Sequence, residues 1–425
     1  MSPKDTNEKQ TPPVVGATTS GAVLTNNLNK TANYLGLKRN IILMLGLTVL
    51  MYTGEKLWER FIPKYLDGLG ASILIIGAFG FLQNFLGAIW ALPGGYIADH
   101  LGNRKAFLVF SILAIFGYVI AIVFNSWIAV FIGMLFFFGW SNVALPGSMS
   151  LITKTLGKGK TVMGISMHSL IRRVPMALGP IIGGYLIVSY GLLTGIKIAF
   201  GISILLSLIG MIFINRLTTD ERETKPEKIH PIQLWKTFDK KLKNLLVSDI
   251  LVRFCEQIPY VFVVIWCLNV VKISASEFGY LTAIEMVTSA LIFIPVANYS
   301  DRLEKKPFVV ITFIFFTIFP FMLYFSNSFG LLAVAFFIRG LKEFGEPTRK
   351  ALILELSKKG TEARSFGMYY FIRDGIVAFA GFLGGVLWKV SPELNLFLAT
   401  GFGILGTIYF AFFGRGTDAN SEFVK

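Results

Sequence analysis

The chain has 425 residues, of which 54% are hydrophobic and 15% are charged, and its mean hydropathy is +0.64. Soluble domains carry about 25% charged residues, so this composition excludes an ordinary soluble globular protein. At about 20 apolar residues per bilayer crossing, twelve crossings would use about 240 residues. The composition therefore predicts an all-α membrane protein with many spans.

The N-terminal part opens with a polar stretch, residues 1–37, which lacks the apolar core of a signal peptide. We expect a disordered cytoplasmic tail there. Six apolar segments follow and predict a six-helix bundle over residues 38–214. Each is continuously apolar and long enough to cross a bilayer, which favours helices over barrel strands. The predicted spans are 38–64, 74–97, 106–125, 127–152, 162–189 and 192–214.

Residues 215–244 are polar and are predicted to form a cytoplasmic linker between two bundles. Within it, Trp235, Phe238 and Leu242 contribute to the apolar face of a basic helix, a pattern typical of a helix on an anionic membrane surface. A solvated linker helix is the alternative. A second bundle is predicted over 245–414, followed by a cytoplasmic tail at 415–425. Its spans are 245–271, 276–299, 307–326, 328–352, 365–389 and 393–414.

The net charge of +15 would suggest a nucleic-acid partner on a soluble protein. Here most of the 40 Lys and Arg residues fall in the tails and in the loops on the side of the N-terminus. Because cytoplasmic loops are enriched in Lys and Arg, we expect both termini in the cytoplasm and no nucleic-acid partner. The two cysteines, Cys255 and Cys267, fit neither a disulfide framework nor a zinc motif.

The two sets of spans repeat each other at a nearly fixed offset. Asp99 and Asp301 are 202 residues apart, as are Gly77 and Gly279. The segment LIRRVPMALGPIIGG (170–184) aligns with FIRDGIVAFAGFLGG (371–385). Since six is an even number of spans, both units have the same orientation, and two parallel halves are predicted.

The loop GGYIADHLGNRKAFL (94–108) resembles the signature loop of the major facilitator superfamily, through Gly95, Asp99, Gly102, Arg104 and Lys105. A degenerate copy in residues 297–308 holds Asp301 and Arg302. With the spans and the repeat, the resemblance covers nearly the whole chain. It implies the major facilitator fold, with twelve transmembrane helices in two parallel six-helix halves, of the drug/proton-antiporter-like kind.

The same resemblance implies a cytoplasmic latch made of Gly95, Asp99, Gly102, Arg104, Asp301 and Arg302. Asp99 would engage the start of the span 365–389, near residues 361–365, and Asp301 would be its counterpart against the span 162–189. The alternative is that these residues only fix topology, because basic residues stay at the inner surface.

The segment ALGPIIGG (177–184) resembles the Gly-Pro-x-x-Gly-Gly core of a fifth-helix motif typical of proton-driven exporters. Pro175 and Ser166 replace the upstream glycines of that motif. Gly179 and Gly183, like Gly381 and Gly385, are four residues apart, a spacing that by itself predicts close helix contact.

Ionisable residues within the spans give the richest functional information, because a charge in the bilayer needs a partner, water or a function. Several have candidate partners at helical spacing: Lys56–Glu59, Arg253–Glu256, Arg339–Glu343 and Lys342–Glu346. Glu346, Arg349 and Lys350 are expected near the inner interface. Glu285 is a further charge in the span 276–299.

Other charges have no local explanation. Arg172 and Arg173 have no acid in their span. Arg373 and Asp374, at the equivalent place, point about 100° apart on a helix, so we expect that they cannot satisfy each other fully. In the superfamily these helices line the central cavity, where arginine suits a carboxylate or phosphate. We predict a substrate-binding and proton-coupling site made of Glu55, Glu59, Arg172, Arg173, Arg253, Glu256, Arg373 and Asp374. Among these, Glu55, Glu59, Glu256 and Asp374 are the candidates for the coupling proton.

No enzymatic motif is convincing. GKGKT (157–161) lacks the first glycine of a nucleotide-binding loop, because Lys154 stands there. We expect no metal and no cofactor. The leading hypothesis is a monomeric, proton-coupled secondary transporter of a small anionic or zwitterionic organic solute or drug, working by alternating access in the plasma (bacterial inner) membrane. Export and import of an organic anion both remain open, and a non-transporting receptor or assembly factor on the same scaffold is the further alternative.

Overall fold

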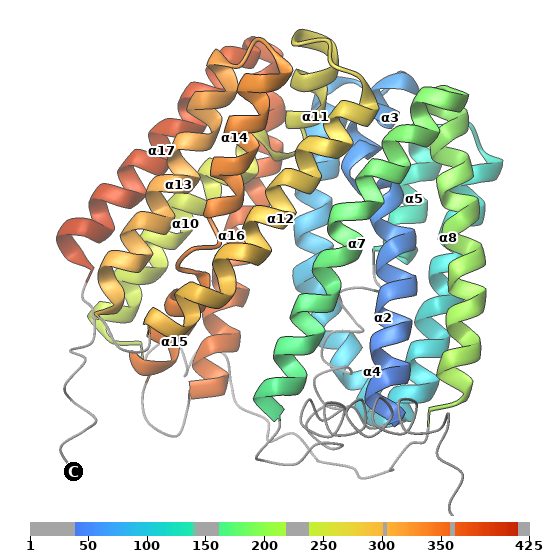
Figure 1. Cartoon of the computed structure of the whole chain (residues 1–425), viewed down its shortest axis with the longest axis horizontal. Coiled ribbons are helices and arrows are strands. Elements are labelled where there is room, and N and C mark those ends of the chain that lie inside the picture. Colours follow the sequence, from blue (N-terminus) through green and yellow to red (C-terminus); the bar gives the residue numbers. More distant parts are fainter. Residues whose placement is uncertain are drawn as a thin grey trace, which may run out of the picture.

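The computed structural model describes residues 39–138, 140, 161–217, 238–300, 304–357 and 362–414. All regular elements in these ranges are helical, and they form two halves that lie side by side (Figure 1). The predicted tails at 1–37 and 415–425 and most of the predicted linker lie outside the described residues.

The N-terminal half is drawn in blue to green in Figure 1. Its elements are α2 (Arg39–Trp58), η1 (Glu59–Phe61), α3 (Ile62–Gly68), α4 (Ile73–Val123), α5 (Trp127–Phe137), α7 (Thr161–Tyr190) and α8 (Leu192–Asn215).

The C-terminal half is drawn in yellow to red. Its elements are α10 (Lys240–Tyr260), α11 (Val263–Ile265), η2 (Trp266–Val270), α12 (Ala275–Ser300), α13 (Lys305–Phe325), α14 (Phe329–Leu341), α15 (Glu346–Glu355), α16 (Glu362–Val390) and α17 (Pro392–Phe413).

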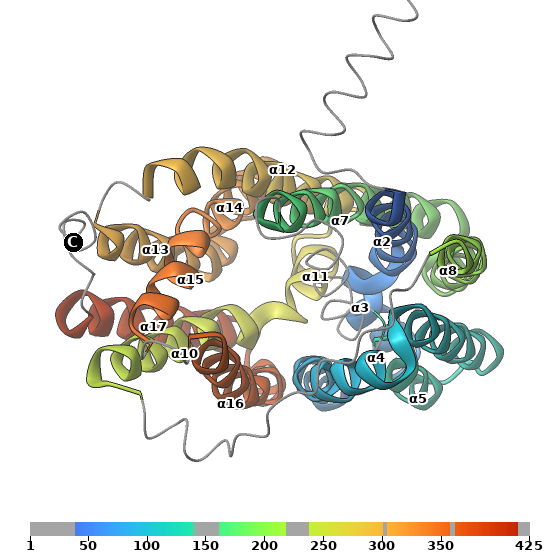
Figure 2. The same ribbon diagram turned by 90° about the horizontal axis from the view of Figure 1, so that it is seen from below.

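Helix α4 contains two of the predicted spans and turns back on itself. Its beginning follows Gly68, which packs on Leu192, and its end precedes Asn125, which accepts a hydrogen bond from Lys197. Since Leu192 and Lys197 both lie at the start of α8, the two ends of α4 lie at the same end of the molecule. Figure 2 shows the bend from the opposite end.

Helix starts carry side-chain caps that fix where the chain leaves each loop. Ser72 accepts a hydrogen bond from the backbone N–H of Ile75, and Asp239 accepts one from that of Leu242 at 2.7 Å. These short polar residues satisfy N–H groups that a helix leaves unpaired in its first turn. Ser126, Ser328 and Ser391 do the same for α5, α14 and α17.

The predicted repeat appears as matching backbone contacts in the two halves. A methyl group added to Gly183 would lie 1.8 Å from the carbonyl oxygen of Leu57, and one added to Gly384 would lie 2.1 Å from that of Ile258. Gly183 and Gly384 are 201 residues apart in sequence, and so are their contacts Leu57 and Ile258. The glycines therefore let α7 approach α2, and α16 approach α10, at equivalent places.

Matching glycine contacts also join the two halves. Gly184 of α7 packs on the carbonyl of Ala275 in α12, while Gly77 of α4 packs on Gly385 of α16. In both views α7 and α12 are neighbours, and α4 lies beside α16 (Figures 1 and 2). These contacts lie away from the end of the molecule at which α17 finishes with Phe413.

Apolar surface covers the outside of the molecule as a membrane protein requires. Large exposed apolar side chains include Phe116 on α4, Leu205 on α8 and Phe412 on α17. Among the described residues, six helices are long and apolar enough to span a bilayer, or seven if α10 and the segment after it count as one bent span. Every predicted span contains described helix, and the all-α membrane fold is confirmed.

The start of α10 differs from the predicted linker boundary. Residues 240–244, assigned to the linker from the sequence, belong to α10. Phe238, Leu242 and Leu245 are buried in an apolar cluster with Phe313. This part of the expected surface helix is therefore packed inside the C-terminal half, because the apolar face has protein to cover it. Residues 231–237 of that helix lie outside the described residues.

Candidate functional site

Glu285 of α12 is a completely buried carboxylate at one end of an ionic network in the C-terminal half. Its Oε1 lies 3.2 Å from both the Nε of Arg339 and the Nζ of Lys342. Its Oε2 lies 3.7 Å from Arg60, which comes from the other half. The guanidinium of Arg339 also stacks on Phe319, at 4.6 Å from the ring centroid. A buried carboxylate needs such compensation, because desolvation of an unpaired charge is costly.

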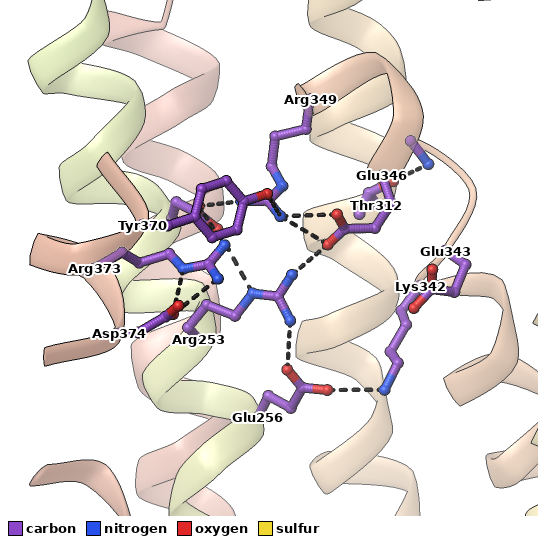
Figure 3. A network of polar contacts seen from close by, with 12 residues as sticks. Arg253, Glu256, Thr312, Lys342, Glu343, Glu346, Arg349, Tyr370, Arg373 and Asp374 are labelled. Carbon is purple, nitrogen blue, oxygen red and sulfur yellow. Dashed lines mark hydrogen bonds and ion pairs between the residues drawn. The ribbon is translucent and has the colours of Figure 1, made fainter. Parts of the chain in front are cut away.

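Lys342 continues the network to α10. Its Nζ lies 2.8 Å from Glu256, whose other oxygen accepts a bond of 2.7 Å from Arg253. Arg253 in turn pairs with Glu346 of α15. Figure 3 shows this chain of alternating charges running from Lys342 through Glu256 and Arg253. It joins α10 to the region between α14 and α15.

The other end of the network, away from Glu285, is centred on Asp249 of α10, which is 1% exposed. Asp249 pairs with Arg349, accepts a 3.0 Å hydrogen bond from the hydroxyl of Tyr369, and lies 3.4 Å from Arg373. Arg373 also bonds its neighbour Asp374 at 2.8 Å. Three helices of the C-terminal half are thereby tied together by one carboxylate.

The network of the C-terminal half is electrically balanced among the described residues. Five acids face five bases, and each has an oppositely charged partner within 4 Å. The acids are Asp249, Glu256, Glu285, Glu346 and Asp374, and the bases are Arg253, Arg339, Lys342, Arg349 and Arg373.

The N-terminal half holds a smaller group on α2 and η1. Lys56 lies between two carboxylates, 2.9 Å from Glu55 and in contact with Glu59. The amide of Gln83 donates a 3.4 Å hydrogen bond to Glu59. Two acids therefore share one lysine.

Arg172 of α7 differs from every base described above. Its guanidinium stacks on the ring of Tyr52 at 4.5 Å, and its buried Nε has no hydrogen-bond partner. No carboxylate of the described residues lies within ion-pair distance of it. Since stacking on an aromatic ring leaves the in-plane N–H donors of a guanidinium available, Arg172 retains capacity for an anion.

Among the described residues, two ion pairs cross from one half to the other. Arg60 reaches Glu285, and Arg173 of α7 lies 3.2 Å from Glu343, a residue between α14 and α15. Arg173 also donates a 2.8 Å hydrogen bond to Ser289 of α12. These pairs lie beside Arg172 and Lys56 in sequence, so the ionisable groups of the two halves meet in one region.

The span predicted at 328–352 is interrupted in the structure, and this corrects two expected ion pairs. α14 ends at Leu341 and α15 begins at Glu346, so the i,i+4 geometry expected for Arg339–Glu343 and Lys342–Glu346 is lost. The freed N–H of Gly345 donates instead to the hydroxyl of Thr312 at 2.5 Å. Non-helical backbone at membrane depth requires such a partner.

Other expectations concern residues nearby. Glu346 and Arg349 are buried inside the network, and their position near the inner interface stays a prediction. Arg373 and Asp374 contact each other, but Arg373 also pairs with Asp249 and the Asp374 side chain is 39% exposed, so they do not satisfy each other fully. Lys56–Glu59 and Arg253–Glu256 pair as predicted.

The predicted site residues thus fall into two groups joined by the inter-half pairs. Glu55, Glu59, Arg172 and Arg173 lie in the N-terminal half, while Arg253, Glu256, Arg373 and Asp374 belong to the network. Asp249 is missing from the predicted site. Its i,i+4 spacing to Arg253 was the available signal.

The predicted latch is described only in part. Arg104 donates a 3.4 Å hydrogen bond to Asn215 within its own half. The side chains of Gly95, Asp99 and Gly102, and residues Asp301 and Arg302, lie outside the described residues. The latch stays a prediction.

The family model described as Major Facilitator Superfamily matches residues 44–270 and 245–425. The chain is a member of the Major Facilitator Superfamily. It is therefore a multi-pass membrane transporter and not an enzyme. No group of three His, Cys, Asp or Glu side chains suited to a metal lies among the described residues.

Relatives within the superfamily differ in how much of the chain they match. An uncharacterised MFS-type transporter of Methanocaldococcus jannaschii is 24% identical over 396 residues, which cover 88% of this chain and 95% of the relative. The multidrug resistance protein 1 of Bacillus subtilis is 25% identical over 157 residues, covering 36% of this chain and 40% of the relative. A solved transporter of the POT family, in complex with a thioalcohol-conjugated peptide, has a TM-score of 0.74 at 14% identity, covering 88% of this chain and 95% of that structure, and shares the fold.

Proposed function

We propose that this protein is a proton-coupled secondary transporter of small organic solutes that carry a carboxylate or another anionic group. The single observation that supports the anionic group is Arg172, a guanidinium without an acid partner among the described residues. All bases of the adjoining network have acid partners, so this residue stands out.

An unpaired charge at this depth costs several kcal/mol, and a bound anion would recover that cost. Arginine offers planar, bidentate donors that match a carboxylate. A zwitterionic solute is also compatible, because Asp374 has a 39% exposed side chain and a single arginine partner. The proposed substrates are therefore organic anions and zwitterions.

Proton coupling is proposed from the group around Lys56. Glu55 and Glu59 share this one lysine, so one of them has an incomplete ionic environment. Glu256, by contrast, contacts two cations, Arg253 and Lys342. Among the acids nominated from the sequence, Glu55 and Glu59 are favoured to bind and release the proton.

Alternating access is supported by where the halves touch. The glycine contacts of Gly77 with Gly385, and of Gly184 with Ala275, lie in the part of the molecule away from the described C-terminal end. We propose that these contacts open while the opposite end closes. The protein is proposed to lie in the plasma membrane with both termini cytoplasmic, since Lys and Arg residues gather in the tails and in the loops on the side of the N-terminus. It is also proposed to act as a monomer.

Export and import are both candidates for the direction of transport. The ALGPIIGG segment, whose glycines pack on α2, and the partial similarity to a multidrug resistance protein favour it. The arginines of the site favour import of an organic anion. A receptor or assembly factor on the same scaffold is the third possibility, and transport measurements separate it from both.

The test is uptake of radiolabelled benzoate, lactate and succinate into proteoliposomes with and without an imposed pH gradient. We expect at least one of these anions to move in a proton-dependent manner. R172Q should reduce that transport at least about tenfold, as expected for loss of one charge-assisted contact of about 1.4 kcal/mol or more. The control K389Q removes an exposed cation at the end of α16 and should be neutral. Transport of none of the anions, or normal transport by R172Q, contradicts the proposal.

A further inference from the structure

Glu343 holds Arg173 with a single contact, unlike the acids of the network. One carboxylate oxygen lies 3.2 Å from one guanidinium nitrogen. Arg349, in comparison, bonds both oxygens of Glu346 at 2.9 and 2.8 Å. The Glu343 side chain is 25% exposed, whereas that of Glu346 is 6% exposed. The Arg173–Glu343 contact is therefore water-accessible and geometrically incomplete.

The backbone around Glu343 is not held by a regular helix. It lies in the turn between α14 and α15, and its N–H reaches the carbonyl of Gly340 at 3.4 Å, a long hydrogen bond. Its neighbour Lys342 points to Glu256 and Glu285 instead. A swing of the Glu343 side chain breaks no helical hydrogen bond.

Arg173 is also the neighbour of Arg172 on α7, the base without an acid partner. Arg173 already binds a carboxylate from the opposite half, Glu343, so its guanidinium is a second candidate on α7 for a solute carboxylate. The side chain of Glu343 and a solute carboxylate are chemically alike, and both suit the same donors.

We propose that Glu343 is a tethered competitor, a built-in carboxylate that a solute carboxylate displaces from Arg173. This inference rests on the proposed function, and it identifies the residue that links solute binding to the contact between the halves. When the solute carboxylate pairs with Arg173, Glu343 leaves it, and the Arg173–Glu343 bridge between the halves opens. Ser289 stays bound to the other nitrogen and keeps the guanidinium oriented.

The test measures the affinity of the purified full-length protein for benzoate, with benzamide as a neutral analogue. A tethered group competes at an effective concentration in the millimolar range, so E343Q should tighten benzoate binding by about tenfold. Benzamide binding should not change. E343A should behave as E343Q does, and E393Q, at the exposed start of α17, should have no effect.

A double-mutant cycle separates competition from a structural effect. In an R173Q background, E343Q should give no gain in benzoate affinity, because the contested arginine is gone. Tight benzoate binding that neither E343Q nor E343A strengthens contradicts the inference alone, as does the same gain in the R173Q background. Failure of the wild-type protein to bind benzoate contradicts the carboxylate site of the proposed function and this inference with it.

Discussion

Arg349 and Asp249 form an ion pair in which each side chain is only 1% exposed. The two residues are 100 positions apart in sequence and join α15 to α10. Asp249 also accepts a hydrogen bond from Tyr369 and forms an ion pair with Arg373, both on α16. A buried pair of this kind leaves an uncompensated charge when one partner is removed.

Replacement of one partner should therefore be far more harmful than removal of an exposed pair. We expect D249N to destabilise the protein by about 3–5 kcal/mol, seen as a fall of the thermal unfolding midpoint in detergent. The control K64Q breaks the more exposed Lys64–Asp67 pair and should cost about 1 kcal/mol or less. Equal effects of the two substitutions would contradict the role assigned to Asp249.

Gly183 and Gly201 provide a matched pair of substitutions in neighbouring helices. G183A places a methyl group against the backbone of Leu57 and should cost about 1–3 kcal/mol or more by overpacking. At Gly201 nothing lies within 4 Å, so G201A should be neutral or stabilise α8 by up to about 1 kcal/mol. Thermal unfolding checks both. A tolerated G183A would show that α7 does not pack this closely on α2.

Gly77 controls the contact between the halves away from the chain termini. G77V cannot keep the approach to Gly385, where an added methyl would already lie 2.7 Å from its Cα. We expect a shift of about tenfold toward the state in which this contact is open, from a cost of about 1–3 kcal/mol. Spin labels at Asp67 and Asn269, which come from the two halves and are hydrogen-bonded to each other, report the change as longer distances. G401V, at an open position, is the control, and unchanged distances in G77V would contradict the prediction.

The break between α14 and α15 depends on the hydroxyl of Thr312. T312V leaves the buried N–H of Gly345 without an acceptor and should destabilise the protein by about 1–3 kcal/mol. T312S keeps the hydroxyl and should retain most of the stability. The comparison of their thermal midpoints isolates the hydrogen bond from the loss of volume. Equal midpoints would show that the break does not need this bond.

The sequence predicts the elements that depend on local information. Continuous apolar segments define the spans, and the glycines at 183 and 385 mark close helix contacts because only a missing side chain permits them. The i,i+3 pairs Lys56–Glu59 and Arg253–Glu256 also follow from spacing within one helix. These features need no knowledge of which helices are neighbours.

Most of the ionic network could not be predicted in the same way, because these contacts join different helices. Lys342 and Glu285 are 57 positions apart, and Tyr369 and Asp249 are 120 apart. A regular helix through residues 339–346 also favours i,i+4 pairs that the break removes. Gly345 and Pro347 were the local signs of that break. The tertiary arrangement, rather than spacing, chooses the partner of each charge.

Because Asp249 finds Arg349, Tyr369 and Arg373 on later helices, the network constrains how the chain is made and inserted. Asp249 emerges from the ribosome 100 residues before Arg349 and 120 before Tyr369. During that interval α10 carries a buried carboxylate whose partner within the same helix is Arg253, 3.8 Å away, and a charge within the bilayer is costly. We expect the early helices of this half to stay beside the insertion machinery or the N-terminal half until α15 and α16 supply the other partners of Asp249.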